Sequence, residues 1–305
     1  MDTSHSEDSG QVRGAMPESH EQEMAQGKRF AFGKNWSHFL RLLDDSRIDH
    51  AKTSLQRMLG RDSLNGLRFL DAGSGSGLFS LAARMLGAAV TSFDYDPLSV
   101  ACTSTLRDRY FPQDKMWRIE QGSVLDRTYL SNLGQFDVVY SWGVLHHTGA
   151  MWQALDNVGT LVAEGGYLYI AIYNDQGGAS RRWTMVKRYY NKYKLLRPIL
   201  LVVSAIRLWA LSTIRYALLG KTEARGTHSQ ENRGMSRIRD LVDWVGGYPF
   251  EVSSPDRIFD FYHTRGFTLE HLKTRGGIGC NEFVFYRLPQ KPGQSENPWP
   301  GKTEP

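Results

Sequence analysis

Apolar positions along the chain change their period several times, and these changes predict the elements. Residues 1–28 and 289–305 show almost no apolar periodicity, and the second stretch is rich in proline. Such composition is typical of disordered tails. Residues 29–66 place apolar side chains three and four positions apart, which predicts N-terminal helices.

Between residues 67 and 175, strand-like and helix-like segments alternate without a break. The expected strands are LRFLDAG, AAVTSFDYD, WRIEQGS, FDVVYSWG and GYLYIAIYN. Alternation of this kind predicts an α/β fold with a doubly wound, mostly parallel sheet. A helical insertion is expected over 176–255. Residues 256–288 then predict a last helix and an antiparallel terminal hairpin.

Composition narrows the class of protein. The 305 residues are 41% hydrophobic, which suffices for the core of a globular domain. The two cysteines, Cys102 and Cys280, are too few for a disulfide framework or a thiolate metal site, so no metal is expected. No apolar segment at the start resembles a signal peptide, and we therefore expect a cytoplasmic protein.

The turn after the first expected strand points to a ligand. Gly73, Gly75 and Gly77 are spaced G-x-G-x-G, whereas a dinucleotide turn needs G-x-G-x-x-G and would place its third glycine where Leu78 stands. No Gly-Lys-Ser/Thr follows, which excludes a P-loop. The turn is therefore predicted to hold a flat, polar ligand without phosphate.

Two carboxylates suggest which ligand this is. Asp94 ends the second expected strand, where a carboxylate can accept both hydroxyls of a ribose. Asp71, at the end of the first, would face an ammonium group, and the helix N-terminus after Gly77 suits a carboxylate. Ribose, ammonium and carboxylate together describe S-adenosylmethionine.

Five blocks in order carry a family resemblance. The chain resembles the class I methyltransferases that use S-adenosylmethionine, over roughly residues 67–175, and is most similar to their small-molecule and quinone-type branch. The blocks are FLDAGSGSG (69–77), SFDYDP (92–97), QGSVLD (121–126), FDVVYSWGVLHHT (136–148) and VAEGGYLYIAIYN (162–174). The resemblance implies a Rossmann-like sheet of seven strands, completed by the terminal hairpin.

The resemblance also implies roles for cofactor-binding residues. Asp71 and the turn Gly73, Gly75 and Gly77 would line the methionine part of the donor, and Asp94 would bind its ribose. The remaining implied contacts are Tyr95 on the adenine face, Ser123 and Val124 along the adenine edge, and Ser141 and Trp142 beside the sulfonium.

Candidate catalytic residues follow the fourth and fifth strands. A hydroxyl acceptor needs a base, and His146, His147, Tyr173 and Asn174 lie at the carboxyl edge where such a site belongs. The alternative is that one of the histidines packs or caps a turn. The candidate acceptor-binding aromatics, which could equally be ordinary packing, are Trp36, Trp183, Tyr190, Trp244 and Tyr248.

The insertion is basic and partly apolar. Residues 176–222 contain ten Lys or Arg and no Asp or Glu. Arginines interrupt the apolar run, so it is not a membrane span. Residues 195–219 predict an amphipathic helix with a polar arc through Arg197, Ser204 and Arg207. It is a packed lid with a solvated basic stripe, a lid that closes over a small acceptor, or a membrane-surface helix.

The expected function is transfer of a methyl group from S-adenosylmethionine to oxygen or nitrogen of a small-molecule acceptor. Nucleic acid is disfavoured as a partner, because the basic residues alternate with large apolar ones. Two alternatives stay open. One is an enzyme that uses the donor for intramolecular cyclisation, and the other is a non-catalytic membrane-surface adaptor. The sequence predicts no oligomeric state.

Overall fold

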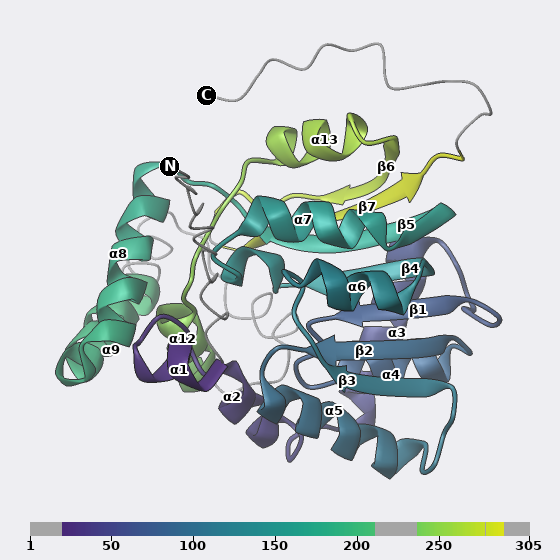
Figure 1. Ribbon diagram of the computed structural model, residues 1–305. Coiled ribbons are helices and arrows are strands. Elements are labelled where there is room, and N and C mark those ends of the chain that lie inside the picture. The colour runs from purple at the N-terminus through teal and green to yellow at the C-terminus, as the bar shows by residue number, and fades with distance from the viewer. Residues whose placement is uncertain (1–19, 211–236, 278, 290–305) are drawn as a thin grey trace, which may run out of the picture.

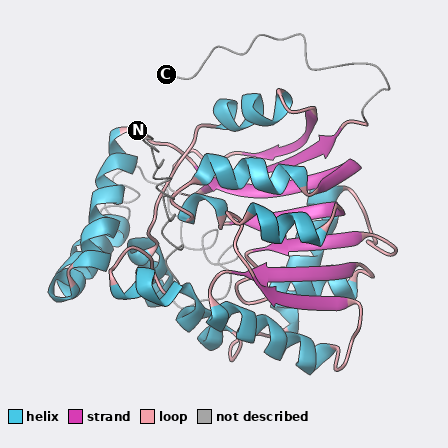
Figure 2. Ribbon diagram, viewed as in Figure 1, coloured by secondary structure: helices cyan, strands magenta, loops and turns pink. Residues whose placement is uncertain are grey.

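A single seven-stranded sheet forms the centre of the protein (Figures 1 and 2). The computed structural model describes residues 20–210, 237–277 and 279–289. The strands lie in the order β3-β2-β1-β4-β5-β7-β6, with β1 to β5 parallel and β7 antiparallel to both of its neighbours. Their bounds are β1 Arg68–Ala72, β2 Ala89–Asp94, β3 Trp117–Gln121, β4 Phe136–Trp142, β5 Val162–Tyr173, β6 Phe267–Lys273 and β7 Cys280–Arg287.

Helices cover both faces of the sheet. Successive strand residues point to opposite faces, so Phe69 packs with one layer and Leu70 with the other. The layer on the side of Phe69 consists of α3 Asp45–Leu59, α4 Leu78–Met85 and α5 Pro97–Tyr110. The opposite layer consists of α6 Arg127–Leu133, α7 Met151–Thr160 and α13 Pro255–His263. The doubly wound sheet with an antiparallel terminal hairpin is confirmed.

Local sequence signals set several helix ends. The Asp44 carboxylate accepts a hydrogen bond from the Arg47 N–H and caps α3, and Gly60 ends that helix in the left-handed conformation. Asp96 caps α5 in the same way, with Pro97 in the first turn.

The remaining helices gather beyond the carboxyl ends of the parallel strands (Figure 1). Trp183 and Tyr190 of α8 join Leu241 and Val245 of α12 in a third apolar cluster, which anchors the insertion. The elements in this region are α1 His20–Ala25, α2 Phe32–Phe39, η1 Leu145–His147, α8 Gly178–Lys192, η2 Lys194–Leu196, α9 Arg197–Ala205, η3 Ile206–Ala210 and α12 Arg237–Gly246.

Two boundaries differ from expectation. The predicted N-terminal tail reaches residue 28, but His20–Ala25 form α1, and Glu23 pairs with Arg29 at 2.6 Å. The fifth strand begins at Val162, earlier than the expected GYLYIAIYN. Residues 1–19 and 290–305 of the expected tails lie outside the described residues.

Helix α9 buries part of the expected solvated polar stripe. Ser204 is buried, and Arg197 donates from Nε to the Tyr190 carbonyl at 3.0 Å, with its guanidinium over the Tyr190 ring, whereas Arg207 is exposed. Leu200 and Leu201 pack on the third apolar cluster. Ile199 and Val203 point outward, 60% and 56% exposed. Residues 211–219 of the predicted helix lie outside the described residues.

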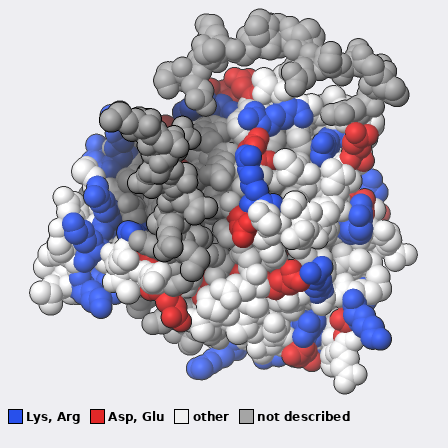
Figure 3. Space-filling view, viewed as in Figure 1, with Lys and Arg blue, Asp and Glu red and all other residues white. Residues whose placement is uncertain are grey.

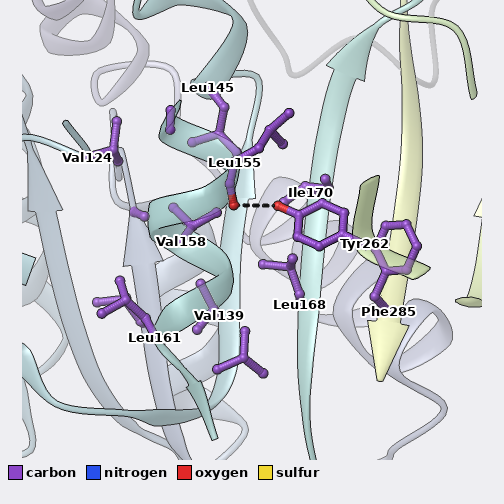
Figure 4. Close-up of a cluster of buried hydrophobic side chains, with 14 of the residues drawn as sticks. Val124, Val139, Leu145, Leu155, Val158, Leu161, Leu168, Ile170, Tyr262 and Phe285 are labelled. Atoms are coloured by element: carbon purple, nitrogen blue, oxygen red, sulfur yellow. Dashed lines mark hydrogen bonds between the residues drawn. The ribbon is translucent and has the colours of Figure 1, made fainter. Parts of the chain in front are cut away.

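Tyr262 joins the two helices α7 and α13 across the sheet face (Figure 4). Its fully buried hydroxyl donates to the Leu155 carbonyl at 2.9 Å, and its ring packs on Phe285. We expect Tyr262→Phe to lower the free energy of unfolding by about 1 kcal/mol and Tyr262→Ala by about 3–5 kcal/mol. Urea denaturation followed by circular dichroism measures both. Tyr189→Phe, at an exposed ring, is the control, and an equal loss there would contradict the assignment.

Candidate functional site

The turn between β1 and α4 is fixed by hydrogen bonds to the end of β2. Gly73 and Ser74 both donate their N–H groups to the Phe93 carbonyl, at 2.8 and 3.0 Å. Gly75 donates its N–H to Asp94 Oδ2 at 2.9 Å. The first strand's turn and the second strand's carboxylate therefore form one unit.

This turn requires glycine for reasons of space. Gly73 has φ +86°, and a Cβ there would lie 2.5 Å from the Val144 side chain. Gly75 has φ +56°, and a Cβ there would lie 3.0 Å from the indole nitrogen of Trp36. Gly77 instead lets α4 pack on α5, since its Cβ would meet Thr103. Gly73 and Gly75 thus make room for Val144 and Trp36, and the backbone of both glycines lines the first pocket.

Two buried carboxylates flank the turn. Burial raises the pKa of Asp71 to about 7, although Ser80 donates a hydrogen bond that acts in the opposite direction. Burial likewise raises the pKa of Asp94 to about 6, against hydrogen bonds from the N–H groups of Asp96 and Gly75. Such carboxylates gain from a ligand that brings cationic groups or hydroxyl donors.

Two pockets meet at this turn. The first, of about 110 Å³, includes Gly75, Asp94, Tyr95, Ser123 and Val124 in its lining. The second, of about 460 Å³, includes Asp71, Ser74 and Trp142. Trp36 and Gly73 line both. The pockets together suit an elongated ligand with a ribose and a flat ring at one end and a cationic group at the other.

The N-terminal segment, residues 20–36, covers one side of the first pocket. Arg29 places its guanidinium 4.9 Å from the centre of the Tyr95 ring and donates to the His147 carbonyl at 3.1 Å. Gly33 donates its N–H to Asp96 Oδ2 at 2.8 Å. His20 also lines the pocket. Sequence reasoning missed His20 and Arg29, because both lie outside the five motif blocks.

The two candidate histidines, His146 and His147, differ in their position relative to the pockets. His147 lines the first pocket, and its Nδ1 lies 2.6 Å from the Pro249 carbonyl. A carbonyl oxygen only accepts, so we assign the proton to Nδ1 and the basic lone pair to Nε2. His146 is fully buried and lines neither pocket, and its ring centre lies 4.1 Å from that of Tyr173 with the two rings tilted by 46°. The pair therefore splits into one pocket residue and one packing residue.

Three further predicted residues have structural contacts instead of a pocket position. Ser141 is buried and donates from Oγ to the Ala72 carbonyl at 2.8 Å, which ties β4 to β1. Asn174 donates to the Arg275 carbonyl and accepts from Asn281, which ties β5 to β7. Tyr173 packs between the histidines and the third apolar cluster. We therefore place none of the three at the reacting atoms.

Among the predicted acceptor-binding aromatics, Trp36 alone lines the pockets. Trp183, Tyr190 and Trp244 belong to the third apolar cluster, and Tyr248 accepts through its carbonyl from the Phe30 N–H. Buried Lys187 donates to the Trp244 carbonyl and lies over that ring, and burial lowers its pKa to about 7. The alternative of ordinary packing describes this group better.

Comparison with known proteins gives the family. Residues 43–199 match the family described as "Methyltransferase domain", which covers half of the chain, and the protein belongs to this family. The resemblance to class I S-adenosylmethionine-dependent methyltransferases is thereby confirmed.

Individual relatives are distant. A tRNA U34 carboxymethyltransferase of Methylococcus capsulatus is 28% identical over 186 residues, which cover 60% of this chain and 55% of that protein. A ubiquinone biosynthesis O-methyltransferase of a Caulobacter species is 30% identical over 121 residues, 38% of this chain and 44% of that protein. The chain thus spans about half the length of these curated relatives. Among solved structures, the N-methyltransferase NodS of Bradyrhizobium japonicum with S-adenosyl-L-homocysteine gives a TM-score of 0.48 at 14% identity, covering 84% of this chain and 98% of NodS.

The raised pKa of Asp71 predicts how stability and donor binding depend on pH. A carboxyl with a higher pKa in the folded state destabilises the ligand-free protein as pH rises from about 4 through about 7. Asp71→Asn should therefore raise the melting temperature of the ligand-free protein by on the order of 5 °C at about pH 8, with no gain at about pH 4.

The affinity for the donor should change with pH in the opposite direction to the stability of the ligand-free protein. The affinity of the wild type for S-adenosylmethionine should rise from about pH 5 to about pH 8, as Asp71 and Asp94 ionise. Asp71→Asn should bind the donor at least about tenfold more weakly at the upper pH. Calorimetric titration and thermal unfolding measure the two effects. Equal melting curves together with unchanged affinity would show that Asp71 is merely a packed polar residue.

Proposed function

We propose that the protein is a methyltransferase that transfers a methyl group from S-adenosylmethionine to oxygen or nitrogen of a small-molecule acceptor. The observation that carries this proposal is the pair of buried carboxylates, Asp71 and Asp94, on either side of a bare glycine turn where two pockets join. Membership of the methyltransferase domain family supports it.

The proposed roles follow from position. Asp94 accepts the ribose hydroxyls, Tyr95 covers the adenine face beneath Arg29, and Ser123 and Val124 border the adenine edge. Asp71 balances the ammonium group, with Trp142 near the methyl end of the second pocket. When bound, the donor supplies an activated methyl group on a sulfonium. The chain's own task is to orient donor and acceptor and to exclude water.

His147 is the proposed base for a hydroxyl acceptor. The Pro249 carbonyl orients its ring and favours the tautomer with the basic lone pair on Nε2. An amine acceptor that is already neutral would need no such base. His147 is therefore a candidate catalytic residue only for an oxygen acceptor whose hydroxyl reaches the first pocket, which His147 lines.

A small-molecule acceptor, rather than a nucleic acid, is supported by the enclosure of the site. Phe30, Phe32 and Trp36 of the N-terminal segment help to line the first pocket and leave a restricted approach to the donor. A role in small-molecule biosynthesis follows from such an acceptor. A cytoplasmic location is part of the same proposal, supported by Cys102 and Cys280, which are buried and are not joined in a disulfide.

Binding of S-adenosyl-L-homocysteine tests the donor assignment directly. We expect one site per chain by isothermal titration calorimetry, and a loss of about tenfold or more for Asp94→Ala, because two hydrogen bonds to a charged acceptor disappear. Asp137→Ala is the control, a carboxylate at the opposite end of the sheet that pairs with Arg68. Absence of binding to the wild type would overturn the proposed function.

A second measurement separates methyl transfer from cyclisation of the donor. Incubation of the protein with S-adenosylmethionine alone should leave the donor intact. Methylthioadenosine formed without an acceptor would instead establish the donor-only reaction. Binding without turnover, across acceptors that carry hydroxyl or amine groups, would favour the adaptor alternative.

A peripheral membrane contact is the second part of the proposal. Leu195, Ile199, Val202 and Val203 are more than half exposed along the η2–α9 segment. Exposed cations lie on α8 and η2, which contact α9, at Arg181, Arg182, Arg188, Lys192 and Lys194. Figure 3 shows the blue side chains gathered over α8 and α9 with uncharged surface between them. An apolar strip beside exposed cations suits a bilayer with anionic head groups. No helix in the described residues is long and apolar enough to cross a membrane.

Vesicle binding tests this contact. The protein should sediment with vesicles that contain phosphatidylglycerol and much less with pure phosphatidylcholine, and added salt should weaken the binding. The double substitution Ile199→Asp and Val203→Asp should abolish binding, because both side chains point outward. Met116→Asp, at an exposed residue far from α9, should have no effect. Equal sedimentation of all three proteins would contradict the contact.

A further inference from the structure

The second pocket extends well beyond the part needed for the methionine end of the donor. From Asp71 and Gly73 it continues past Trp142 and Tyr140 of β4, then between α3 and the β6–β7 hairpin. Its volume of about 460 Å³ is that of a pocket for a small organic molecule. The extension therefore has room for an acceptor beside the donor.

The far end of this pocket is basic. Arg47 and Arg57 reach it from α3, and Lys273 and Arg275 reach it from the end of β6. These four cations come from segments more than two hundred residues apart, and they share one cavity only in the folded chain. Such a convergence creates a local positive potential in a partly enclosed site.

Two of these cations have carboxylate partners. Arg47 pairs with Asp44, and Lys273 Nζ lies 3.5 Å from Glu282, which also accepts a hydrogen bond from the Tyr169 hydroxyl at 2.6 Å. Arg57 and Arg275 line the same cavity, so a ligand at this end meets two guanidinium groups that come from different elements.

The lining of the pocket also includes an aromatic part. Phe39, Phe79 and Trp142 contribute to it, and Trp36 contributes to it beside the glycine turn. Aromatic walls favour a flat or apolar body, and guanidinium groups bind carboxylates and phosphates through paired hydrogen bonds. The lining of the pocket therefore has three zones: acidic, aromatic and basic.

We propose that the acceptor is a flat, largely apolar molecule that carries an anionic group, a carboxylate or a phosphate, which Arg57 and Arg275 bind at the basic end of the second pocket. This inference rests on the proposed function and deepens it, since it names the chemical class of the acceptor. Binding at this end orients the body of the acceptor along the aromatic zone, toward the donor at Asp71 and Gly73.

The test uses simple anions on the full-length protein saturated with S-adenosyl-L-homocysteine, so that the donor site is filled. Benzoate and phenyl phosphate are the anionic probes, and benzamide and benzylammonium are the neutral and cationic comparisons. We expect ligand-observed nuclear magnetic resonance to show binding of at least one anion and weaker or no binding of the other two probes. The stronger of the two anions identifies the group as carboxylate or phosphate.

Variants locate the binding. Arg57→Gln and Arg275→Gln should each weaken anion binding on the order of tenfold, and Arg57→Lys should recover only part of it, because an ammonium cannot form the paired hydrogen bonds. Arg118→Gln, at an exposed residue of β3, is the matched control and should bind as the wild type does. Affinity for S-adenosyl-L-homocysteine should be the same in all variants, which also shows that each is folded.

The outcomes separate this inference from the donor assignment. If S-adenosyl-L-homocysteine binds but the anions bind no better than benzamide, or bind equally to the Arg57→Gln, Arg275→Gln and Arg118→Gln proteins, the anionic acceptor is wrong and the donor assignment stands. If S-adenosyl-L-homocysteine does not bind, the proposed function itself fails.

Discussion

The hydrogen bonds between the β1–α4 turn and the end of β2 are the constraint on which the site depends. The Phe93 carbonyl accepts from both Gly73 and Ser74, and Asp94 accepts from Gly75. The parallel register that pairs Asp71 with Ser92 brings the two strand ends to the same edge. Backbone that would otherwise need water is thereby satisfied, while the glycine surface stays open to a ligand. Gly73, which lies in this turn, is part of the lining of both pockets.

The same arrangement holds two carboxylates where burial opposes their ionisation. Asp71 and Asp94 both have raised pKa values, and each raises the energy of the ligand-free protein near neutral pH. A ligand that brings an ammonium group and hydroxyl donors removes this cost, so binding and stability are linked. Burial of the two carboxylates therefore destabilises the ligand-free protein. The same burial makes the site selective for a ligand that carries an ammonium group and hydroxyl donors. The two apolar clusters on the faces of the sheet compensate for this loss of stability.

Features that depend on local sequence pattern could be predicted from the sequence. Features that depend on contacts between distant parts of the chain could not. Period and turn chemistry were enough for the doubly wound sheet, the glycine turn and the terminal hairpin. They could not tell His147 from His146, because the two side chains differ only in which neighbours they meet after folding. Helical period predicted a polar arc on α9 but not that Arg197 of this arc would contact Tyr190 and that Ser204 would be buried, because both depend on packing against the rest of the chain.

Charge links the two ends of the second pocket to the chemistry of methyl transfer. Carboxylates lie at the donor end, where a sulfonium and an ammonium must be accommodated, and cations lie at the far end. An acceptor whose anionic group pairs with Arg57 and Arg275 would have that charge neutralised at the end of the pocket away from the donor. The pairing would fix the orientation of the acceptor, so that positioning makes a large contribution to the rate.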